Sequence, residues 1–539
     1  MRRFAPFLLL LPLPLAAQPT LARRVDSLFA SFTTATPGCA AGVARRGEVL
    51  LTKGWGMANL EYGIPLGAGS ILESGSVAKQ FTAAALALLQ LDGTLSLDDD
   101  IHRWLPEVPA FGGQRITIRH LLTHTSGLRD QWGLLSLTGN PPTRQVHTLP
   151  LILDLVRRQQ DLNFPVGSEY LYSNTGYALA AMIVQRASGQ SLAEFTRRRL
   201  FEPMGMTHTS WRDDFQRIVP GRATAYEHRA DGSYAQLMPF TNVYGNGGLL
   251  TTVGDMLTWN EALTRGTIPG GRPLVDLLET RQRLTGGQTI AYALGLMHGS
   301  WEGHRIGAHS GSTAGYSTYL VRFPDYGLSI AVFCNVADGA PTPLAFGIAQ
   351  RVLGVTLSPP PAAPDAATAS AVAGRYRNPA TDDFTEVVVR PQGVLARSPA
   401  GSGLLAFTGR TARLATGATF EFSGAPGARE VAITDADGVR TTWREVVAPN
   451  AMTLRLEDYA GTYESPELRV RYEVRVDGNR LLLRFPPAPD QSLAPIYPDG
   501  FEAEEGTLRF VRDAQGRVTE FQVFAGRVRH VRFLRTGTP

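Results

Sequence analysis

Four consecutive residues, Ser76-Val77-Ala78-Lys79, place a hydroxyl and an amine three positions apart. On a helix, side chains at this spacing lie on one face about one turn apart and can form a hydrogen bond. A serine hydroxyl is a weak nucleophile until a base removes its proton, and a lysine can be that base when burial lowers the pKa of its amine. The spacing therefore predicts nucleophilic catalysis, with Ser76 as the nucleophile and Lys79 as its general base. The alternative is a helix-capping serine beside a solvated lysine.

The scarcity of lysine favours the catalytic interpretation. Lys53 and Lys79 are the only lysines among 52 basic residues, so the other 50 are arginine. Arginine cannot serve as a neutral base because its guanidinium does not lose a proton in proteins. A lysine in an otherwise apolar stretch fits a role that requires the amine.

Two further motifs carry groups that such a reaction needs. Tyr172-Ser173-Asn174 puts a phenol and an amide on a short loop, where they could relay a proton and hold a substrate carbonyl. His309-Ser310-Gly311-Ser312 lies between two strand-like segments; Gly311 would let a substrate approach the strand edge, and the amide of Ser312 could complete an oxyanion hole with that of Ser76. Taken singly, each motif also fits a structural role: a packed tyrosine, a turn asparagine or a structural histidine.

The elements that must position these groups follow from the hydrophobic pattern. Residues 81–91 are apolar almost all round, which predicts a helix buried at the centre of a domain with Ser76 and Lys79 at its N-terminal end. Residues 356–370 are rich in proline and alanine and predict a stiff, extended linker. The chain beyond the linker is strand-like throughout. The length of 539 residues agrees with two or three domains.

An approximate repeat in the last part of the chain predicts two related β units. Ala373-Gly374-Arg375-Tyr376 is echoed by Ala460-Gly461-Thr462-Tyr463, and residues 435–438 are echoed by residues 513–516. In the second unit, residues 468–476 and 480–485 flank the turn Asp477-Gly478-Asn479 and predict a hairpin.

Composition and the N-terminal residues indicate the partners and the cellular location of the protein. The net charge of +4 is spread over the whole chain, and no basic run interleaved with aromatics suggests nucleic acid as a partner. Met1-Arg2-Arg3, the apolar residues 4–15 and Ala16-Ala17-Gln18 match the three zones of a secretory signal peptide. No later stretch approaches the ~20 apolar residues of a membrane span. We expect a protein exported to the periplasm or the extracellular space.

The only two cysteines, Cys39 and Cys334, lie in apolar, strand-like segments. A single bridge between them would be possible in an oxidising compartment. We favour two buried, unpaired thiols instead.

In their order along the chain, the three motifs resemble S-x-x-K, Y-x-N and K/H-x-G of the serine β-lactamase and penicillin-binding peptidase superfamily. The segments between these motifs resemble its branch of class C β-lactamases, D-alanyl-D-alanine carboxypeptidases, D-aminopeptidases and esterases. These segments are Pro37-Gly38, Lys53-Gly54-Trp55-Gly56, Leu121-Leu122-Thr123-His124-Thr125-Ser126-Gly127 and Gly247-Gly248-Leu249. The resemblance covers roughly residues 25 to 350.

The resemblance implies an α/β (α+β) fold: a β-lactamase/transpeptidase-like domain with an antiparallel sheet flanked by helices, then two C-terminal all-β, lipocalin-like barrel units. The expected division is a signal peptide at 1–17, a hydrolase domain at 21–355, a linker at 356–370, and β units at 371–448 and 452–537.

The same resemblance implies roles for the site residues. Ser76 would be acylated, Lys79 would be its general base and Tyr172 a proton relay. Asn174, His309 and Gly311 would contact the substrate, and the amides of Ser76 and Ser312 would form the oxyanion hole. It implies no metal or organic cofactor, and it makes His124 and Ser126 framework residues rather than a second acid/base pair.

The expected function is an exported serine hydrolase that acts on D-amino-acid peptides, amides or esters through an acyl-enzyme. True β-lactamases usually carry lysine where this chain has His309, so β-lactamase activity is the alternative. A non-hydrolytic penicillin-binding or muropeptide-sensing protein is the alternative of another class. An α/β-hydrolase is disfavoured because no G-x-S-x-G occurs.

Overall fold

The computed structural model describes residues 21–139, 145–358, 364–398, 401–414, 417–435, 439–450, 454–504 and 506–537. The predicted signal peptide, residues 1–17, lies outside the described residues. Within the described ranges, no helix combines the length and the apolar character needed to cross a bilayer.

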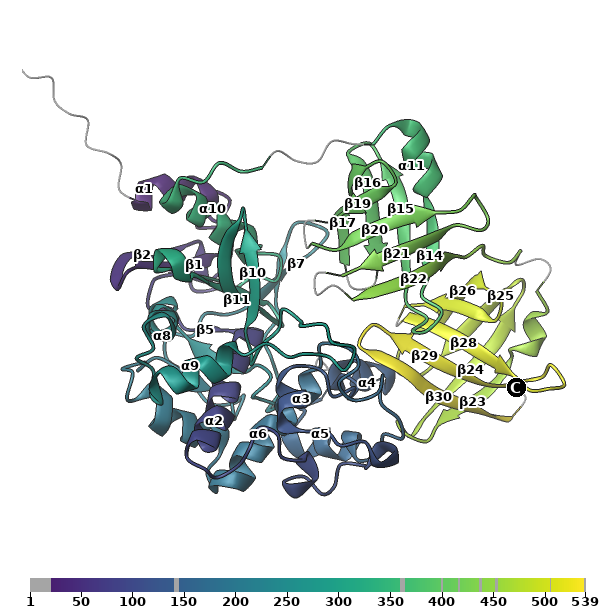
Figure 1. Ribbon diagram of the computed structural model, residues 1–539, viewed down its shortest axis with the longest axis horizontal. Helices are drawn as coiled ribbons and strands as arrows, with labels where there is room; N and C mark the ends of the chain where they lie inside the picture. The colour runs from purple at the N-terminus through teal and green to yellow at the C-terminus, as the bar shows by residue number, and fades with distance from the viewer. Residues whose placement is uncertain are drawn as a thin grey trace, which may run out of the picture.

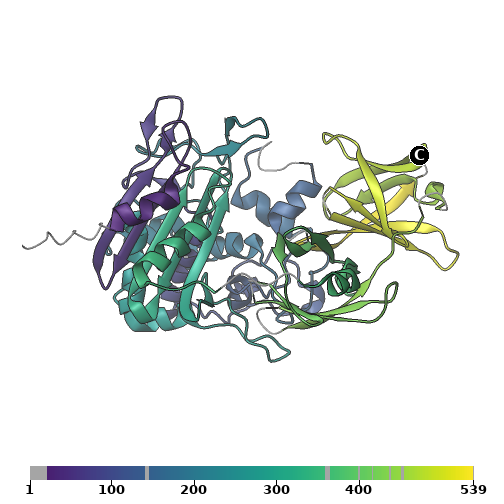
Figure 2. The ribbon, with the colours of Figure 1, turned by 90° about the horizontal axis from the view of Figure 1, so that it is seen from above.

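A six-stranded antiparallel sheet forms one side of the N-terminal domain (Figures 1 and 2). Its strand order is β10-β11-β12-β13-β1-β2. The strands are β1 (Cys39–Arg45), β2 (Glu48–Trp55), β10 (Met297–Trp301), β11 (His304–Thr313), β12 (Tyr316–Phe323) and β13 (Leu328–Cys334). Every residue of β12 and β13 is buried, as expected for central strands that are covered on both faces.

Helices cover both faces of this sheet. Helices α1 (Leu21–Val25) and α10 (Pro341–Leu353) pack on one face, and α8 (Val253–Arg265) packs on the other. Along β1, Cys39, Ala41 and Val43 point into the core beneath α10, whereas Ala40 points into the core of the helical lobe. This alternation is the two-residue period of a strand, and it produces the predicted arrangement of an antiparallel sheet between helices.

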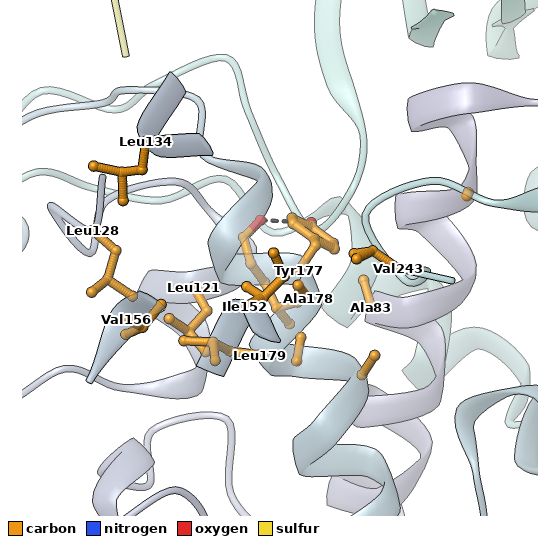
Figure 3. Packing of buried hydrophobic residues seen from close by; sticks show 14 of the residues in the cluster. Ala83, Leu121, Leu128, Leu134, Ile152, Val156, Tyr177, Ala178, Leu179 and Val243 are labelled. Atoms are coloured by element: carbon orange, nitrogen blue, oxygen red, sulfur yellow. Dashed lines mark hydrogen bonds between the residues drawn. The ribbon is translucent and has the colours of Figure 1, made fainter. Parts of the chain in front are cut away.

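The predicted central helix is α2 (Lys79–Leu91), and it is buried from Lys79 to Leu89. It packs against α6 (Asn174–Ser188), α7 (Leu192–Thr196) and α9 (Gly271–Glu279). Figure 3 shows Ala83 of α2 near Tyr177 and Ala178 of α6, where small side chains let the two helices approach. The lobe also contains α3 (Ile118–Leu122), α4 (Gln131–Leu137) and α5 (Leu149–Val156).

Short strands and single turns connect the sheet to this lobe. The strands are β3 (Met57–Asn59), β4 (Ile64–Pro65), β5 (Leu72–Glu73), β6 (Ser210–Trp211), β7 (Tyr226–His228), β8 (Tyr234–Gln236) and β9 (Leu249–Thr251). The 3-10 turns are η1 (Asp26–Phe29), η2 (Gly75–Ala78), η3 (Ile101–Arg103), η4 (Phe111–Gly113) and η6 (Pro324–Tyr326), and η5 (Arg197–Phe201) is a π turn.

The expectation of two unpaired thiols is wrong, because Cys39 and Cys334 form a disulfide. The two residues face each other directly in the pairing of β1 with β13. They are 295 positions apart in sequence. Only the strand order of the sheet makes them neighbours, which is why the sequence left both alternatives open.

The first C-terminal unit is a nine-stranded antiparallel sheet that begins after α11 (Ala366–Val372). The chain is therefore helical from Ala366, where the linker prediction expected extended chain as far as residue 370. The strands are β14 (Gly374–Arg377), β15 (Phe384–Arg390), β16 (Gly393–Ser398), β17 (Gly401–Leu404), β18 (Ala406–Thr408), β19 (Thr411–Arg413), β20 (Thr419–Ser423), β21 (Glu430–Thr434) and β22 (Arg440–Glu445).

The second C-terminal unit closes into an eight-stranded barrel, β23 to β30, after η8 (Leu456–Asp458). Its strands are β23 (Gly461–Ser465), β24 (Val470–Asp477), β25 (Arg480–Arg484), β26 (Gln491–Tyr497), β27 (Gly500–Ala503), β28 (Gly506–Arg512), β29 (Val518–Ala525) and β30 (Val528–Gly537). The predicted hairpin is confirmed as β24 and β25, with Asp477 paired to Arg480 across the turn.

The repeat detected in the sequence has a structural counterpart. Tyr376 begins the first unit and donates a hydrogen bond from its hydroxyl to the carbonyl of Val372 at 2.8 Å. Tyr463 donates in the same way to the carbonyl of Tyr459 at 2.7 Å, again four residues upstream. Both tyrosines tie the first strand of their unit to the segment before it. Residues 436–438 of the second repeated segment lie outside the described residues.

The barrel lies beside the helical lobe (Figure 1). A buried ion pair joins the two. Nη1 of Arg129, just before α4, lies 2.6 Å from a carboxylate oxygen of Glu467 in the barrel, and both side chains are at most 1% exposed. Arg129 also donates to the carbonyls of Arg529 and His530. The hydroxyl of Tyr472 donates to the carbonyl of Leu137 at 2.7 Å. The barrel is thus fixed to the lobe by charge and by backbone contacts.

We predict that Glu467→Gln lowers the free energy of unfolding by about 3 to 5 kcal/mol, because it leaves the charge of Arg129 buried and uncompensated. Urea denaturation followed by fluorescence measures the change. Glu464→Gln is the matched control, because Glu464 pairs with Arg471 at the exposed surface of the same barrel, and it should cost about 1 kcal/mol or less. Equal losses in the two variants would contradict the proposed importance of the buried pair.

Candidate functional site

Ser76 lies in the 3-10 turn η2, and Lys79 is the first residue of α2. The prediction expected both on one helix; instead the tighter turn carries Ser76. Side chains three residues apart eclipse one another in a 3-10 turn, so the pair still meets. The amine nitrogen of Lys79 lies 3.0 Å from Oγ of Ser76. The geometric part of the prediction from the spacing therefore holds.

Lys79 is completely buried among oxygen acceptors. Its amine donates to the side-chain carbonyl of Asn174 at 2.9 Å and to the backbone carbonyl of Asn246. A neutral amine has two N–H groups and one lone pair. If the two carbonyls take the N–H groups, the lone pair faces the hydroxyl of Ser76, which is the arrangement that a general base needs.

Burial lowers the pKa of Lys79 well below the value of a free lysine, and the positive charge of Arg527 lowers it further. The carboxylate of Asp130 acts in the opposite direction and raises this pKa. Lys53, the other lysine, has a side chain that is 39% exposed, and its amine pairs with Asp26 at 2.6 Å.

Asp130 is a buried carboxylate that the sequence prediction missed. It caps α4 by accepting a hydrogen bond from the amide of Trp132 at 3.0 Å. Its second oxygen accepts from both the backbone amide and the side-chain amide of Asn174, at 2.7 and 2.9 Å. The side-chain oxygen of Asn174 is thereby turned toward Lys79. The only signal in the sequence is an aspartate at a helix N-cap, and it does not indicate contact with Asn174.

Tyr172 lies over the amine of Lys79, with 4.8 Å between the nitrogen and the ring centroid. Burial raises the pKa of its phenol, whereas the nearby Ser76 side chain and the charge of Arg527 lower it. The hydroxyl is buried and has no hydrogen bond of regular geometry to a described residue. Tyr172 is thus a protonated phenol beside the Ser76–Lys79 pair.

His309 lies in β11, so the strand continues through the third motif instead of ending before it. Its Nδ1 is 2.6 Å from the carbonyl of Ser310, and its Nε2 is 2.9 Å from the hydroxyl of Tyr292. A carbonyl can only accept, so Nδ1 carries the proton and Tyr292 donates to Nε2. Burial lowers the pKa of His309 to about 4, and an ammonium at Lys79 would act in the same direction.

The backbone of β11 lies directly against the turn that carries Ser76. A Cβ on Gly311 would be 2.1 Å from the carbonyl oxygen of Ser74 and 3.0 Å from the amide nitrogen of Ser76. Gly75 has φ +51°, and a Cβ there would be 2.6 Å from the amide nitrogen of Ser312. Thr318 of β12 fixes this approach by donating to the carbonyl of Ser74 at 2.8 Å. Glycine at positions 75 and 311 therefore allows the turn and the strand to pack this closely.

His124 lies behind Tyr172, with 4.1 Å between the ring centroids. Its Nδ1 accepts from the amide of Ser173 at 3.0 Å, and burial lowers its pKa well below the usual value. Oγ of Ser126 accepts from the amide of Leu128. These contacts agree with framework roles for His124 and Ser126.

A cavity of about 850 Å³ opens onto Ser76. Its wall includes the apolar side chains of Trp132, Met238, Phe240 and Met297, together with Tyr170. The cavity is also lined by five of the predicted site residues beside Ser76: Tyr172, Asn174, His309, Gly311 and Ser312. Across the described ranges, no group of three or more histidine, cysteine, aspartate or glutamate side chains could hold a metal ion.

The structure thus brings together all seven residues predicted for the site. It adds Asp130, Tyr292, Asn246 and Arg527, which the sequence prediction missed. Tyr292 and Arg527 lie in segments without a recognisable motif, and Asn246 contributes a backbone carbonyl, which any residue type could supply. No pattern in the sequence could have identified these contacts.

Comparison with known proteins agrees with this geometry. The β-lactamase family profile matches residues 25–351, which is more than half of the chain. The chain belongs to the β-lactamase family. A domain family of unknown function, DUF3471, matches residues 445–534, which include most of the barrel.

The named relatives of this family member are hydrolases or penicillin-binding proteins. Penicillin-binding protein 4* of Bacillus subtilis is 31% identical over 311 residues, which span 54% of this chain and 66% of that protein. A D-aminopeptidase of Brucella ovis is 27% identical over 529 residues, which span 93% of this chain and 96% of the relative. Family and relatives identify the chain as a serine hydrolase.

Solved structures show the same fold. The octameric penicillin-binding protein homologue from Pyrococcus abyssi aligns with a TM-score of 0.56 at 22% identity, over 87% of this chain and 98% of that chain. The D-amino acid amidase from Ochrobactrum anthropi SV3 aligns with a TM-score of 0.51 at 23% identity, over 62% of this chain and 98% of that chain.

We predict a pH-dependent stability that can be assigned to His309. Its pKa is about 4 in the folded protein and about 6.5 when unfolded, so between these values only the unfolded chain binds the proton. The free energy of unfolding should therefore fall as pH decreases from 6.5 to 4, with about 3 kcal/mol due to this group. Denaturation of the wild type and of His309→Gln at pH 7, 5.5 and 4 should show their difference shrinking by this amount. His228→Gln, at an exposed histidine, is the control, and a constant difference for His309→Gln would contradict the assignment.

Proposed function

We propose that this chain is an exported serine hydrolase that forms an acyl-enzyme at Ser76 and acts on D-amino-acid peptides, amides or esters. The observation that carries the proposal is the fully buried amine of Lys79, 3.0 Å from Oγ of Ser76, with carbonyl acceptors for its two N–H groups. Within the proposal, the hydrolase domain spans residues 21–355, and the β units span 371–448 and 452–537.

In the acylation step, Oγ of Ser76 attacks the substrate carbonyl carbon while its proton passes to the lone pair of Lys79. The amides of Ser76 and Ser312 receive the negative charge that develops on the carbonyl oxygen. The leaving group departs when it takes a proton from the hydroxyl of Tyr172, which regains one from the ammonium of Lys79. The step yields an ester at Ser76 and restores the neutral amine.

Deacylation reverses this path with water as the nucleophile. Water loses a proton to the Lys79–Tyr172 relay and attacks the acyl carbon, and Oγ of Ser76 leaves with the returned proton. Asn174, held by Asp130, positions both Lys79 and the substrate carbonyl. His309, which is neutral and bound to Tyr292, shapes the strand edge where the substrate lies.

Three observations support the finer parts of the proposal. The relatives and neighbours include proteins named D-aminopeptidase and D-amino acid amidase. The disulfide between Cys39 and Cys334 suits an oxidising compartment, in agreement with the predicted signal peptide. His309 replaces the lysine usual in β-lactamases, which favours peptide, amide or ester substrates over β-lactams. β-Lactamase activity and a non-hydrolytic penicillin-binding role remain the competing functions.

We predict that a chromogenic D-amino-acid ester is turned over continuously and that Ser76→Ala lowers kcat by about 10⁴-fold or more. Incubation with a fluorescent penicillin separates the competing functions. Stable labelling without ester turnover would support the penicillin-binding role, and steady hydrolysis of the penicillin would support a β-lactamase. Ser126→Ala, at a serine outside the reacting group, is the control. Full activity of Ser76→Ala would contradict the mechanism.

We also predict that Asp130→Asn shifts the acidic limb of the pH profile of kcat/KM to lower pH. The base must be neutral, so activity rises with pH through the pKa of Lys79, and the charge of Asp130 raises that pKa. Initial rates between pH 4 and 10 measure the shift. Asp213→Asn, at an exposed ion pair with Arg217, is the control and should leave the limb in place. A shift to higher pH in Asp130→Asn would contradict the electrostatic argument.

A further inference from the structure

The formally charged side chains that line the cavity are all positive. Among the described residues that line it, none is an aspartate or a glutamate. Two arginines line it, Arg212 and Arg527. Both N–H donors of Arg212 that face Glu73 are used, at 2.9 Å each, in a buried ion pair. Nη1 of Arg212 has no hydrogen-bond partner among the described residues, but the charge of Arg212 is compensated by Glu73. Arg527 is the cationic group of the wall that has no carboxylate partner among the described residues.

Arg527 comes from the C-terminal barrel, in the turn between β29 and β30 (Figure 1). Its guanidinium carbon lies 4.6 Å from the ring centroid of Tyr172, so it stacks on the phenol beside the nucleophile. Within the described part of the chain, its side chain has no hydrogen bond or ion pair to the protein. Arg527 is exposed at the wall of the cavity, and its donors have no protein acceptor among the described residues.

The turn is held in place by its own backbone. The carbonyl of Arg527 accepts from the side-chain amide of Asn163 at 3.0 Å and from the backbone amide of Asp130 at 3.3 Å. The amide of Arg529 donates to the side-chain oxygen of Asn163 at 2.8 Å. Since Asn163 and Asp130 belong to the helical lobe, the position of Arg527 relative to Tyr172 is set by the docking of the barrel.

We propose that Arg527 is a specificity-determining residue that binds a carboxylate on the leaving-group side of the substrate. The inference rests on the proposed function, because Tyr172 protonates the leaving group in that mechanism and Arg527 stacks on Tyr172. A guanidinium presents paired N–H donors that match the two oxygens of a carboxylate. A substrate ammonium has no carboxylate to meet in the described wall. The preferred substrate is then a peptide or ester whose leaving group carries a free carboxylate, with an apolar acyl side chain against Trp132 and Phe240.

The test compares two substrates that differ only in this charge: N-acetyl-D-phenylalanyl-D-alanine and its C-terminal amide. Release of D-alanine or D-alaninamide gives kcat/KM for each. The wild type should prefer the carboxylate substrate. Arg527→Gln should lower the ratio of kcat/KM for the carboxylate to kcat/KM for the amide by about 10-fold to 100-fold, because this is the effect of losing a charge-assisted hydrogen bond. Arg527 also affects the pKa of Lys79, but that effect acts on both substrates and cancels in the ratio.

Two controls separate a specific role from a general one. Arg469→Gln removes an exposed arginine of the same barrel that does not line the cavity, and it should leave the ratio unchanged. Arg527→Lys retains the charge without the paired donors and should keep part of the preference. Circular dichroism of each variant establishes that the barrel remains folded.

The failure of this proposal is distinguishable from failure of the proposed function. An unchanged ratio in Arg527→Gln, with hydrolysis still abolished by Ser76→Ala, would overturn the role of Arg527 alone. Hydrolysis that survives Ser76→Ala would overturn the proposed function. Calorimetric binding of the two peptides to Ser76→Ala needs no turnover: tighter binding of the carboxylate that is lost in the Ser76→Ala/Arg527→Gln double variant supports the proposal, and equal binding of both peptides overturns it.

Discussion

The site depends on the complete burial of the amine of Lys79 inside the protein. Burial disfavours its ammonium form, and the positive charge of Arg527 acts in the same direction. The carboxylate of Asp130 acts in the opposite direction, and its oxygens accept hydrogen bonds from Asn174 and from the amide of Trp132. The central helix α2, apolar almost throughout, places this amine one tight turn from Ser76.

The barrel is part of this arrangement. Arg129, buried against Glu467 of the barrel, is adjacent in sequence to Asp130, and the carbonyl of Arg129 accepts from the hydroxyl of Thr175 at 2.7 Å. Thus the segment that anchors the barrel also orients the start of α6, which carries Asn174. Two consecutive residues, Arg129 and Asp130, therefore contact both the barrel and the start of α6.

Several parts of the fold and the site were predictable because the relevant interactions are local. The spacing of Ser76 and Lys79, the apolar pattern of α2 and the turn at Gly478 all depend on residues within a few positions of one another. The paired tyrosines Tyr376 and Tyr463 followed from the repeat. The linker prediction failed at residues 366–370 because alanine, which allows extended chain, is also the strongest helix former, and Asp365 caps the helix.

The sequence by itself determined the residue types that could react, the family resemblance that their order carries, and the all-β character of the last third of the chain. Tertiary structure alone decided that Cys39 faces Cys334, that Asp130 holds Asn174, and that Arg527, 355 positions further along the chain, reaches Tyr172. The reason is physical: periodicity records which face of an element is buried, whereas pairing between distant elements is set by packing, strand order and domain docking.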